Sequence, residues 1–369
     1  MKKKIKCETC NTLNPSRNIY CSKCTRYLRF NNVNLKQTKE FDAYISSLKK
    51  ICKSLSKKIT TKKNLNFKEL LSLYWLRPET ALLYALESKY IKKYFKKNYK
   101  IGDIGCGNGV YTSYLNGFKF KKNFDAFNNI DLKNLDFYNS NKIKLNKFDC
   151  FKSRAPKIEL GLDINSNMIK LSKNLNSFKN LICGDALNIN YKSGNLDLIY
   201  SNSIRDFNSK NLNLSLKECN RLLKNKGKLI LSVPTPYYKK MLYFKNKQTF
   251  YKNSNKIYLA NIYKKLDNGR SIFCRQQISL KKWSSFLKKN NFIIIRHHDY
   301  MSENLLRFWD IGLRKIFPLI FSQLENKIHK IKIKKKFINY FENLLNYHIH
   351  DDMNKKKHGF RTLICQKIG

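Results

Sequence analysis

The feature that most constrains the fold of this chain is a glycine-rich turn that follows a short apolar strand. Residues 101–104 read as that strand, and Gly105, Gly107 and Gly109 follow at alternate positions before helix-compatible residues 110–115. Glycine adopts backbone angles that other residues avoid, and it lets the backbone approach a ligand closely. The spacing therefore predicts a ligand-binding turn, and it differs from the Gly-x-Gly-x-x-Gly of nicotinamide enzymes.

Beyond the turn, apolar strands alternate with helical patterns. We expect strands over residues 158–164, 180–183, 196–201, 228–233, 292–296 and 360–368, and helices over residues 78–95, 166–175, 212–223 and 280–289. Strands separated by helices favour a parallel sheet with helices on both faces. The fold class expected is therefore α/β, with a doubly wound, Rossmann-like sheet.

Acidic residues follow the next two predicted strands. Asp163 stands in Gly161-Leu162-Asp163-Ile164, and Asp185 stands in Cys183-Gly184-Asp185-Ala186. In a doubly wound sheet, the carboxyl ends of the strands are where a nucleoside binds. A solvated surface aspartate is the alternative for either residue alone. Taken with the glycine turn, the two acids predict sites for a ribose diol and for an adenine amino group.

Residues from about 99 to 235 resemble class I S-adenosylmethionine (SAM)-dependent methyltransferases of the type 11 domain group. The resemblance includes a fourth motif at 196–203 and a helix-turn-strand at 219–229. It implies seven strands in the order 3-2-1-4-5-7-6, with the seventh antiparallel, and SAM as cofactor. The cofactor-binding residues that it implies are Asp103, Gly105, Cys106, Gly107, Asn108, Gly109, Asp163, Ile164, Asp185, Ala186, Ser201 and Asn202.

The sequence departs from this family after the fourth motif. Many relatives carry an acid-histidine pair there, whereas this chain has Ile204-Arg205-Asp206-Phe207, which leaves a role for Asp206 in doubt. His297, His298 and Asp299, expected just after the sixth strand, are general-base candidates. Histidines that merely stand at a strand edge are the commoner case, so no catalytic residue is assigned.

Four cysteines near the N-terminus form two paired motifs. Cys7-x-x-Cys10 and Cys21-x-x-Cys24 are separated by ten residues. Two such pairs present four thiolates tetrahedrally, as zinc prefers. We expect a structural zinc ion in a zinc-ribbon-like module, because so short a segment needs a cross-link such as a bound metal ion to fold. Basic and aromatic residues around the module fit RNA docking, although protein docking or a purely structural role fits equally.

The charge of the chain is extreme but diffuse. The formal net charge is +50, and lysine is abundant in every segment rather than in one stripe. The remaining cysteines are single and scattered, which suits reduced thiols. No apolar stretch follows the basic residues at the start, and no apolar run reaches the length of a membrane span. The expectation is a cytoplasmic protein.

We expect the chain to consist of five parts. They are a zinc-ribbon-like module at 1–30, a linker and N-terminal helices at 31–98, the SAM-binding core at 99–300 with an insertion at 117–157, a helical acceptor-side or docking segment at 301–357, and the last core strand at 358–369. The helical segment combines apolar residues with a lysine run. Core or dimer packing is the simpler interpretation, and peripheral membrane contact or cover for a lipid-linked acceptor is the alternative.

Two flanking segments point to the acceptor. Residues 76–82 (Leu-Arg-Pro-Glu-Thr-Ala-Leu) and 307–314 (Arg-Phe-Trp-Asp-Ile-Gly-Leu-Arg) resemble methyltransferases met beside glycan-assembly enzymes. The function expected is methylation of a small molecule, a sugar or a lipid-linked glycan intermediate. One alternative is an RNA methyltransferase that docks RNA on the zinc module. The other is a non-catalytic SAM-binding scaffold protein.

Overall fold

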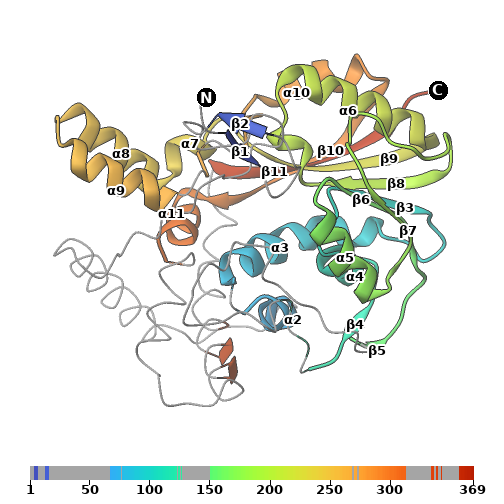
Figure 1. The fold of residues 1–369 in the computed structure, drawn as a ribbon. Coiled ribbons are helices and arrows are strands. Elements are labelled where there is room, and N and C mark those ends of the chain that lie inside the picture. The colour runs from blue at the N-terminus through green and yellow to red at the C-terminus, as the bar shows by residue number, and fades with distance from the viewer. Residues whose placement is uncertain are drawn as a thin grey trace.

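A computed structural model gives the fold of most of the chain (Figure 1). The described residues are 4–6, 13–15, 67–75, 77–122, 124, 126, 150–267, 270–271, 274–312, 334–335, 338–339, 342 and 357–369. Cys7, Cys10, Cys21 and Cys24, and most of the predicted linker and of the 313–356 stretch, lie outside them.

A seven-stranded, mostly parallel sheet forms the centre of the molecule. Its strands are β3 (Ile101–Ile104), β6 (Ile158–Asp163), β7 (Phe178–Cys183), β8 (Leu196–Ser201), β9 (Leu223–Pro234), β10 (Phe292–Ser302) and β11 (His358–Lys367). They lie in the order β7-β6-β3-β8-β9-β11-β10, which is 3-2-1-4-5-7-6 when they are numbered along the chain. β11 runs antiparallel to both β9 and β10, and the other neighbours pair in parallel. The predicted α/β class is confirmed.

Helices cover both faces of the sheet (Figure 1). One buried cluster joins the sheet to α2 (Phe67–Leu73), α3 (Pro78–Ile91), α4 (Val110–Leu115) and α5 (Ser166–Leu175). A second cluster joins the opposite face to α6 (Ser209–Leu222) and α10 (Leu280–Lys288). The turns that connect strands to helices are thereby gathered along the edge where the parallel strands end.

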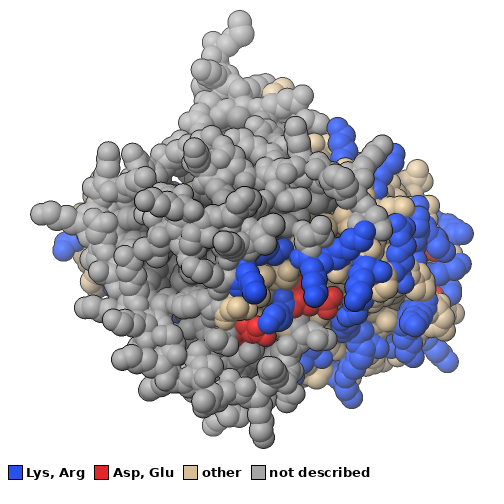
Figure 2. Space-filling view, turned by 90° about the horizontal axis from the view of Figure 1, so that it is seen from below, with Lys and Arg blue, Asp and Glu red and all other residues tan. Residues whose placement is uncertain are grey.

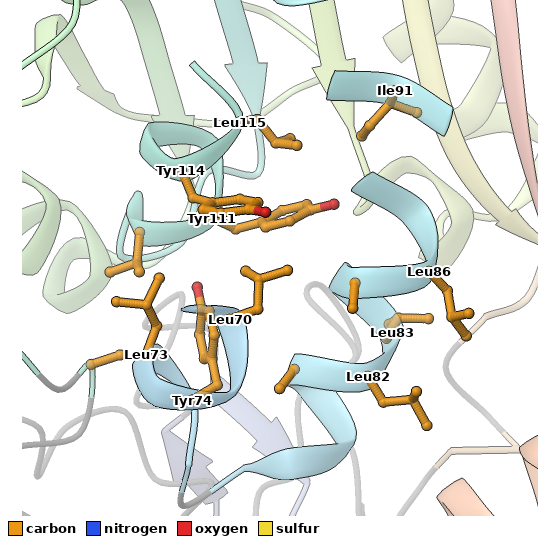
Figure 3. Packing of buried hydrophobic residues seen from close by; sticks show 14 of the residues in the cluster. Leu70, Leu73, Tyr74, Leu82, Leu83, Leu86, Ile91, Tyr111, Tyr114 and Leu115 are labelled. Atoms are coloured by element: carbon orange, nitrogen blue, oxygen red, sulfur yellow. The ribbon is translucent and has the colours of Figure 1, made fainter. Parts of the chain in front are cut away.

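Helix α3 is enclosed by its neighbours rather than lying on the surface. Ten of its 14 residues are buried, and an α-helix that is buried all round is part of the core. Figure 3 shows side chains of α2, α3 and α4 gathered in one buried cluster, among them Leu70, Leu83 and Tyr111. The ring of Tyr84 in α3 stacks on Tyr111, with centroids 3.7 Å apart. These contacts fix α3 against the helix that follows the glycine turn.

Further elements extend the core. Helices α7 (Tyr238–Met241), α8 (Tyr243–Asn253) and α9 (Ile257–Asp267) follow β9, and α8 and α9 form a hairpin that projects from one end (Figure 1). α11 (Glu303–Gly312) follows β10, and short 3-10 turns η2 (Lys92–Tyr94) and η4 (Ile204–Asp206) follow α3 and β8. Within the predicted insertion, β4 (Lys119–Phe120) and β5 (Phe151–Ser153) form an antiparallel pair.

The fifth strand begins earlier than the predicted residue 228: β9 starts at Leu223, and Lys226 within it has a left-handed backbone, with φ 60°. The sixth strand does not end at Arg296 but continues to Ser302, because β11 supplies pairing partners along the whole length. His297, His298 and Asp299 therefore lie within a strand, not after it.

The N-terminal region is described only at two short strands. β1 (Lys4–Lys6) pairs antiparallel with β2 (Leu13–Pro15). Among the described residues, no group of three or more His, Cys, Asp or Glu side chains could hold a metal ion. None of the described helices is both long and apolar enough to cross a bilayer.

Candidate cofactor and acceptor site

The glycine turn joins β3 to α4 and has a left-handed backbone at each glycine. The φ angles are 86° at Gly105, 56° at Gly107 and 74° at Gly109, a region that residues with a Cβ rarely adopt. A Cβ on Gly105 would lie 2.5 Å from Cβ of Ser203, whereas a Cβ on Gly107 would meet nothing within 4 Å. The lack of a side chain at Gly105 thus allows close packing against Ser203. At Gly107, the position that a Cβ would take lies in open space.

Asp163 links the end of β6 to this turn. One carboxylate oxygen accepts the N–H of Gly107 at 2.9 Å and the other accepts the N–H of Asn165 at 2.8 Å. The residue is only 9% exposed, and each carboxylate oxygen can accept more than one hydrogen bond. The sequence placed Asp163 at a strand end, and the structure brings it directly against the glycine turn.

Asp103, the last polar residue of β3, is buried under the turn. It is 2% exposed and accepts a short hydrogen bond from the hydroxyl of Thr112 in α4. Burial raises the pKa of Asp103 to about 7, and the nearby carboxylates of Asp163 and Glu87 add to the rise while the Thr112 hydrogen bond opposes it. Its charge state therefore responds to what binds beside it.

The end of β8 supports the glycine turn from the other side. The hydroxyls of Ser201 and Ser203 both donate to the backbone oxygen of Ile104, at 2.6 and 3.0 Å. Asn202 lies between them and is half-buried. The predicted site residue Ser201 thus positions the turn, and the structure shows its hydroxyl engaged within the protein.

The other predicted residues lie along the same edge of the sheet. Cys183 pairs with Asp163 in the register of β7 and β6, so Asp185 and Ala186 follow immediately beside the Asp163 end. Asp185 accepts the N–H of Leu187 at 3.1 Å, and Asn108 accepts the N–H of Val110 at 3.2 Å. The remaining members, all buried or half-buried, are Cys106, Ile164 and Ala186.

A buried polar cluster that the sequence did not reveal lies between α3 and the strand ends. The hydroxyl of Tyr200 in β8 donates to both oxygens of Glu87, at 3.0 and 3.2 Å, and Glu87 is 1% exposed. The hydroxyls of Ser232 and Tyr300 lie 2.7 Å apart in the same region. Burial raises the pKa of Glu87 to about 7. The only sequence signal was a glutamate within an otherwise apolar helix, which must find partners when buried.

The predicted general-base candidates have different environments. Asp299 accepts from Nε and Nη2 of Arg361 on β11, at 2.5 and 2.6 Å, which engages both of its oxygens. The ring of His298 stacks on Tyr90 of α3 at 4.4 Å, and burial lowers the pKa of His298. His297 is exposed. Of the three, only His298 contacts the helix that faces the strand ends.

Comparison with known proteins gives one family match. Residues 146–231 match the family described as a methyltransferase domain, and this stretch contains β6, β7, β8 and part of β9. None of the curated proteins matches the sequence significantly.

Several solved structures are similar in fold. The geranyl diphosphate C-methyltransferase of Streptomyces coelicolor is 11% identical with a TM-score of 0.37, and the match covers 79% of this chain and 84% of that one. The [4+2]-cyclase SpnF is 13% identical with a TM-score of 0.42, covering 79% and 83%. The YcgJ protein of Bacillus subtilis is 12% identical with a TM-score of 0.37, covering 76% and 98%. At these scores the neighbours say nothing about the function of this chain.

Proposed function

We propose that this protein is a SAM-dependent methyltransferase acting on a small-molecule acceptor, a sugar or a lipid-linked glycan intermediate. The contact between Asp163 and Gly107 carries the proposal, because it joins a carboxylate suited to a ribose diol to the one turn glycine whose Cβ direction is open. The methyltransferase-domain match over residues 146–231 supports the same conclusion.

The residues present fit such a cofactor. Asp163 and Asp185 would hold the adenosine part, and the backbone of Gly105 to Gly109 would approach the methionine part. SAM, when bound, supplies a methyl group on a positively charged sulfur. The chain's own task is to align donor and acceptor and to exclude water. Helix α3, whose Glu87 accepts from Tyr200 near the end of β8, would contribute to this exclusion.

The acceptor assignment is supported by a contact between the two flanking segments. The indole Nε1 of Trp309 in α11 donates to the backbone oxygen of Glu79 in α3, at 2.8 Å, and Trp309 is 6% exposed. Segments 76–82 and 307–314 were the ones that resembled enzymes met beside glycan assembly. Because this contact joins the two segments, we assign them together to the acceptor side.

RNA is the second candidate acceptor. Figure 2 shows Lys and Arg side chains spread over the described part of one face, with few acidic side chains among them, and the net charge of +50 favours polyanions. The zinc-ribbon-like module at Cys7, Cys10, Cys21 and Cys24 would dock the RNA. Retention of bulk RNA by the full chain that weakens steeply with salt, and that is lost when Cys21 and Cys24 are replaced by serine, would favour this function.

Calorimetry with S-adenosylhomocysteine tests the cofactor, and mass spectrometry tests the acceptor. Glycans and metabolites from cells with and without the gene should differ by one methylene group in mass. Absence of binding by a folded sample would overturn the methyltransferase proposal. Binding with no methylated product from any acceptor would favour the non-catalytic scaffold.

A further inference from the structure

The turn after β8 holds an arginine, Arg205, that has two buried guanidinium nitrogens without a hydrogen-bond partner. Nε and Nη1 of Arg205 in η4 are shielded from solvent and have no hydrogen-bond partner. Among the described residues, no carboxylate lies within ion-pair distance of this guanidinium. Leaving a buried donor unpaired costs about 1–3 kcal/mol, and more for a charged group. An arginine cannot relieve this cost by losing its proton.

The nearby acids are already engaged with other groups. Asp206 accepts the backbone N–H of Cys274 at 2.6 Å, and both oxygens of Glu87 accept from Tyr200. Because burial raises the pKa of Glu87 to about 7, a large fraction of this carboxyl is protonated at neutral pH. Against the cost of burial, the charges of Asp206 and Glu87 favour the cationic form of Arg205 and raise its pKa, but neither carboxylate makes a direct hydrogen bond to the guanidinium.

The charge of Arg205 acts on titratable groups of both α3 and the sheet. Burial raises the pKa values of Tyr84, Glu87 and Tyr300, and the charge of Arg205 opposes the rise at all three. The first two belong to α3 and the third to β10. The guanidinium carbon also lies 5.8 Å from the ring centroid of Phe360 in β11. Arg205 thus faces the region between the enclosing helix and the strand ends.

The backbone around Arg205 is fixed on two sides. Its carbonyl accepts the N–H of Gln276 at 3.1 Å, and the side-chain amide of Gln276 donates to the backbone oxygen of Phe207 at 2.7 Å. Two residues earlier, Ser203 contacts Gly105 of the glycine turn. Arg205 is therefore held at a fixed place next to the proposed cofactor site.

From these contacts we infer that Arg205 binds an anionic group, a carboxylate or a phosphate, on the methyl acceptor. That the bound molecule is the methyl acceptor rests on the proposed function. That it carries an anionic group rests on the unpaired guanidinium. An anion bound here would give the buried N–H groups charge-assisted hydrogen bonds, the strong kind. A neutral acceptor would leave them unpaired. The acceptor class is thereby narrowed to phosphorylated or carboxylated molecules.

The methionine carboxylate of the cofactor is the other source of such an anion, and the test separates the two. The full chain, Arg205→Met and the matched control Arg275→Met are compared. Arg275 is exposed, so both variants lose one positive charge from a chain of net charge +50. Calorimetry measures the affinity for S-adenosylhomocysteine. Inorganic phosphate is then titrated with and without that ligand at constant ionic strength, and thermal unfolding is followed.

We expect the full chain and Arg275→Met to respond to phosphate alike, and Arg205→Met to need at least about tenfold more phosphate for the same stabilisation. S-adenosylhomocysteine affinity should be the same in all three. Without phosphate, Arg205→Met should be as stable as the full chain or more stable, because replacing an unpaired buried charge by an apolar side chain is often stabilising.

Three results overturn the inference. Equal phosphate responses in both variants would refute the anion site and leave the methyltransferase proposal intact. A loss of S-adenosylhomocysteine affinity of about tenfold or more in Arg205→Met alone would assign the arginine to the cofactor carboxylate instead. No S-adenosylhomocysteine binding by the full chain would refute the proposed function, and with it the acceptor assignment, while the phosphate titration still reports on Arg205 itself.

Discussion

Alanine at Gly105 should mainly lower the stability of the fold, whereas alanine at Gly107 should mainly weaken cofactor binding. Both glycines have left-handed backbones, with φ 86° and 56°, so either substitution adds strain. A Cβ at Gly105 would also lie 2.5 Å from Cβ of Ser203, whereas a Cβ at Gly107 would meet no atom within 4 Å. Only at Gly107 does the added methyl group enter open space, which is the space proposed for the cofactor.

The magnitudes follow from these contacts. Left-handed strain at an alanine costs about 1–2 kcal/mol, so Gly107→Ala should lower the free energy of unfolding by about that amount. At Gly105 the displacement of Ser203 adds about 1–3 kcal/mol of overpacking, which brings the loss to about 2–5 kcal/mol. Affinity for S-adenosylhomocysteine should nevertheless fall at least about tenfold in Gly107→Ala, because the methyl group blocks close approach of the backbone.

Denaturant unfolding followed by tryptophan fluorescence measures the free energy of unfolding, and calorimetry measures the affinity for S-adenosylhomocysteine. Gly194→Ala is the matched control, because Gly194 also has a positive φ, of 60°, and nothing within 4 Å of its Cβ position, but lies away from the glycine turn in sequence. The control should lose stability like Gly107→Ala and keep its affinity. Unchanged affinity in Gly107→Ala, or a stability loss as large as that of Gly105→Ala, would refute the reasoning.

Three other predictions concern single side chains. Asp163→Asn leaves one acceptor oxygen for two backbone N–H groups, so the free energy of unfolding should fall by about 1–3 kcal/mol and calorimetry should show weaker S-adenosylhomocysteine binding; unchanged values in both assays would contradict the assigned role. Burial raises the pKa of Glu87 from 4.5 to about 7, so its stabilising effect is full below pH 4.5 and is lost as pH rises through 7. Glu87→Gln should therefore remove up to about 1.4 kcal/mol per pH unit from the pH dependence of unfolding in that window, unlike the exposed control Glu303→Gln. Metal analysis of the full chain should find one zinc per chain, reduced by Cys21→Ser, and a metal-free folded chain would rule zinc out.

The sequence predicted the glycine turn and the strand ends around it, where the cofactor is proposed to bind, because their signals are local. The strand at Ile101–Ile104 and the helix at Val110–Leu115 have the predicted bounds, since three glycines mark the turn between them. Asp163 could be placed at a strand end by the apolar run before it. Its hydrogen bond to Gly107 then follows from parallel pairing of β6 and β3, which brings the two strand ends together.

The polar cluster around Glu87, on the proposed acceptor side, could not be predicted because its contacts are distant in sequence. Tyr200 and Glu87 are 113 residues apart, and no periodicity links a helix before the sheet to a strand within it. The extension of β10 to Ser302 likewise depends on β11, whose Arg361 pairs with Asp299 from 62 residues away. Such contacts arise from tertiary packing, which local propensity does not determine.

This division has a consequence for how the protein selects its acceptor. The residues proposed to bind the cofactor come from the ends of β3, β6, β7 and β8 and the turns after them. The groups proposed to face the acceptor come from α3, η4 and β10, and α3 is itself held by Trp309 of α11 through Glu79. Of α3, η4, β10 and α11, only η4 lies within residues 146–231, the methyltransferase-domain match. Substitutions in α11 that shift α3 through Glu79 should therefore weaken acceptor binding more than S-adenosylhomocysteine affinity, because the residues proposed to bind the cofactor lie on other elements.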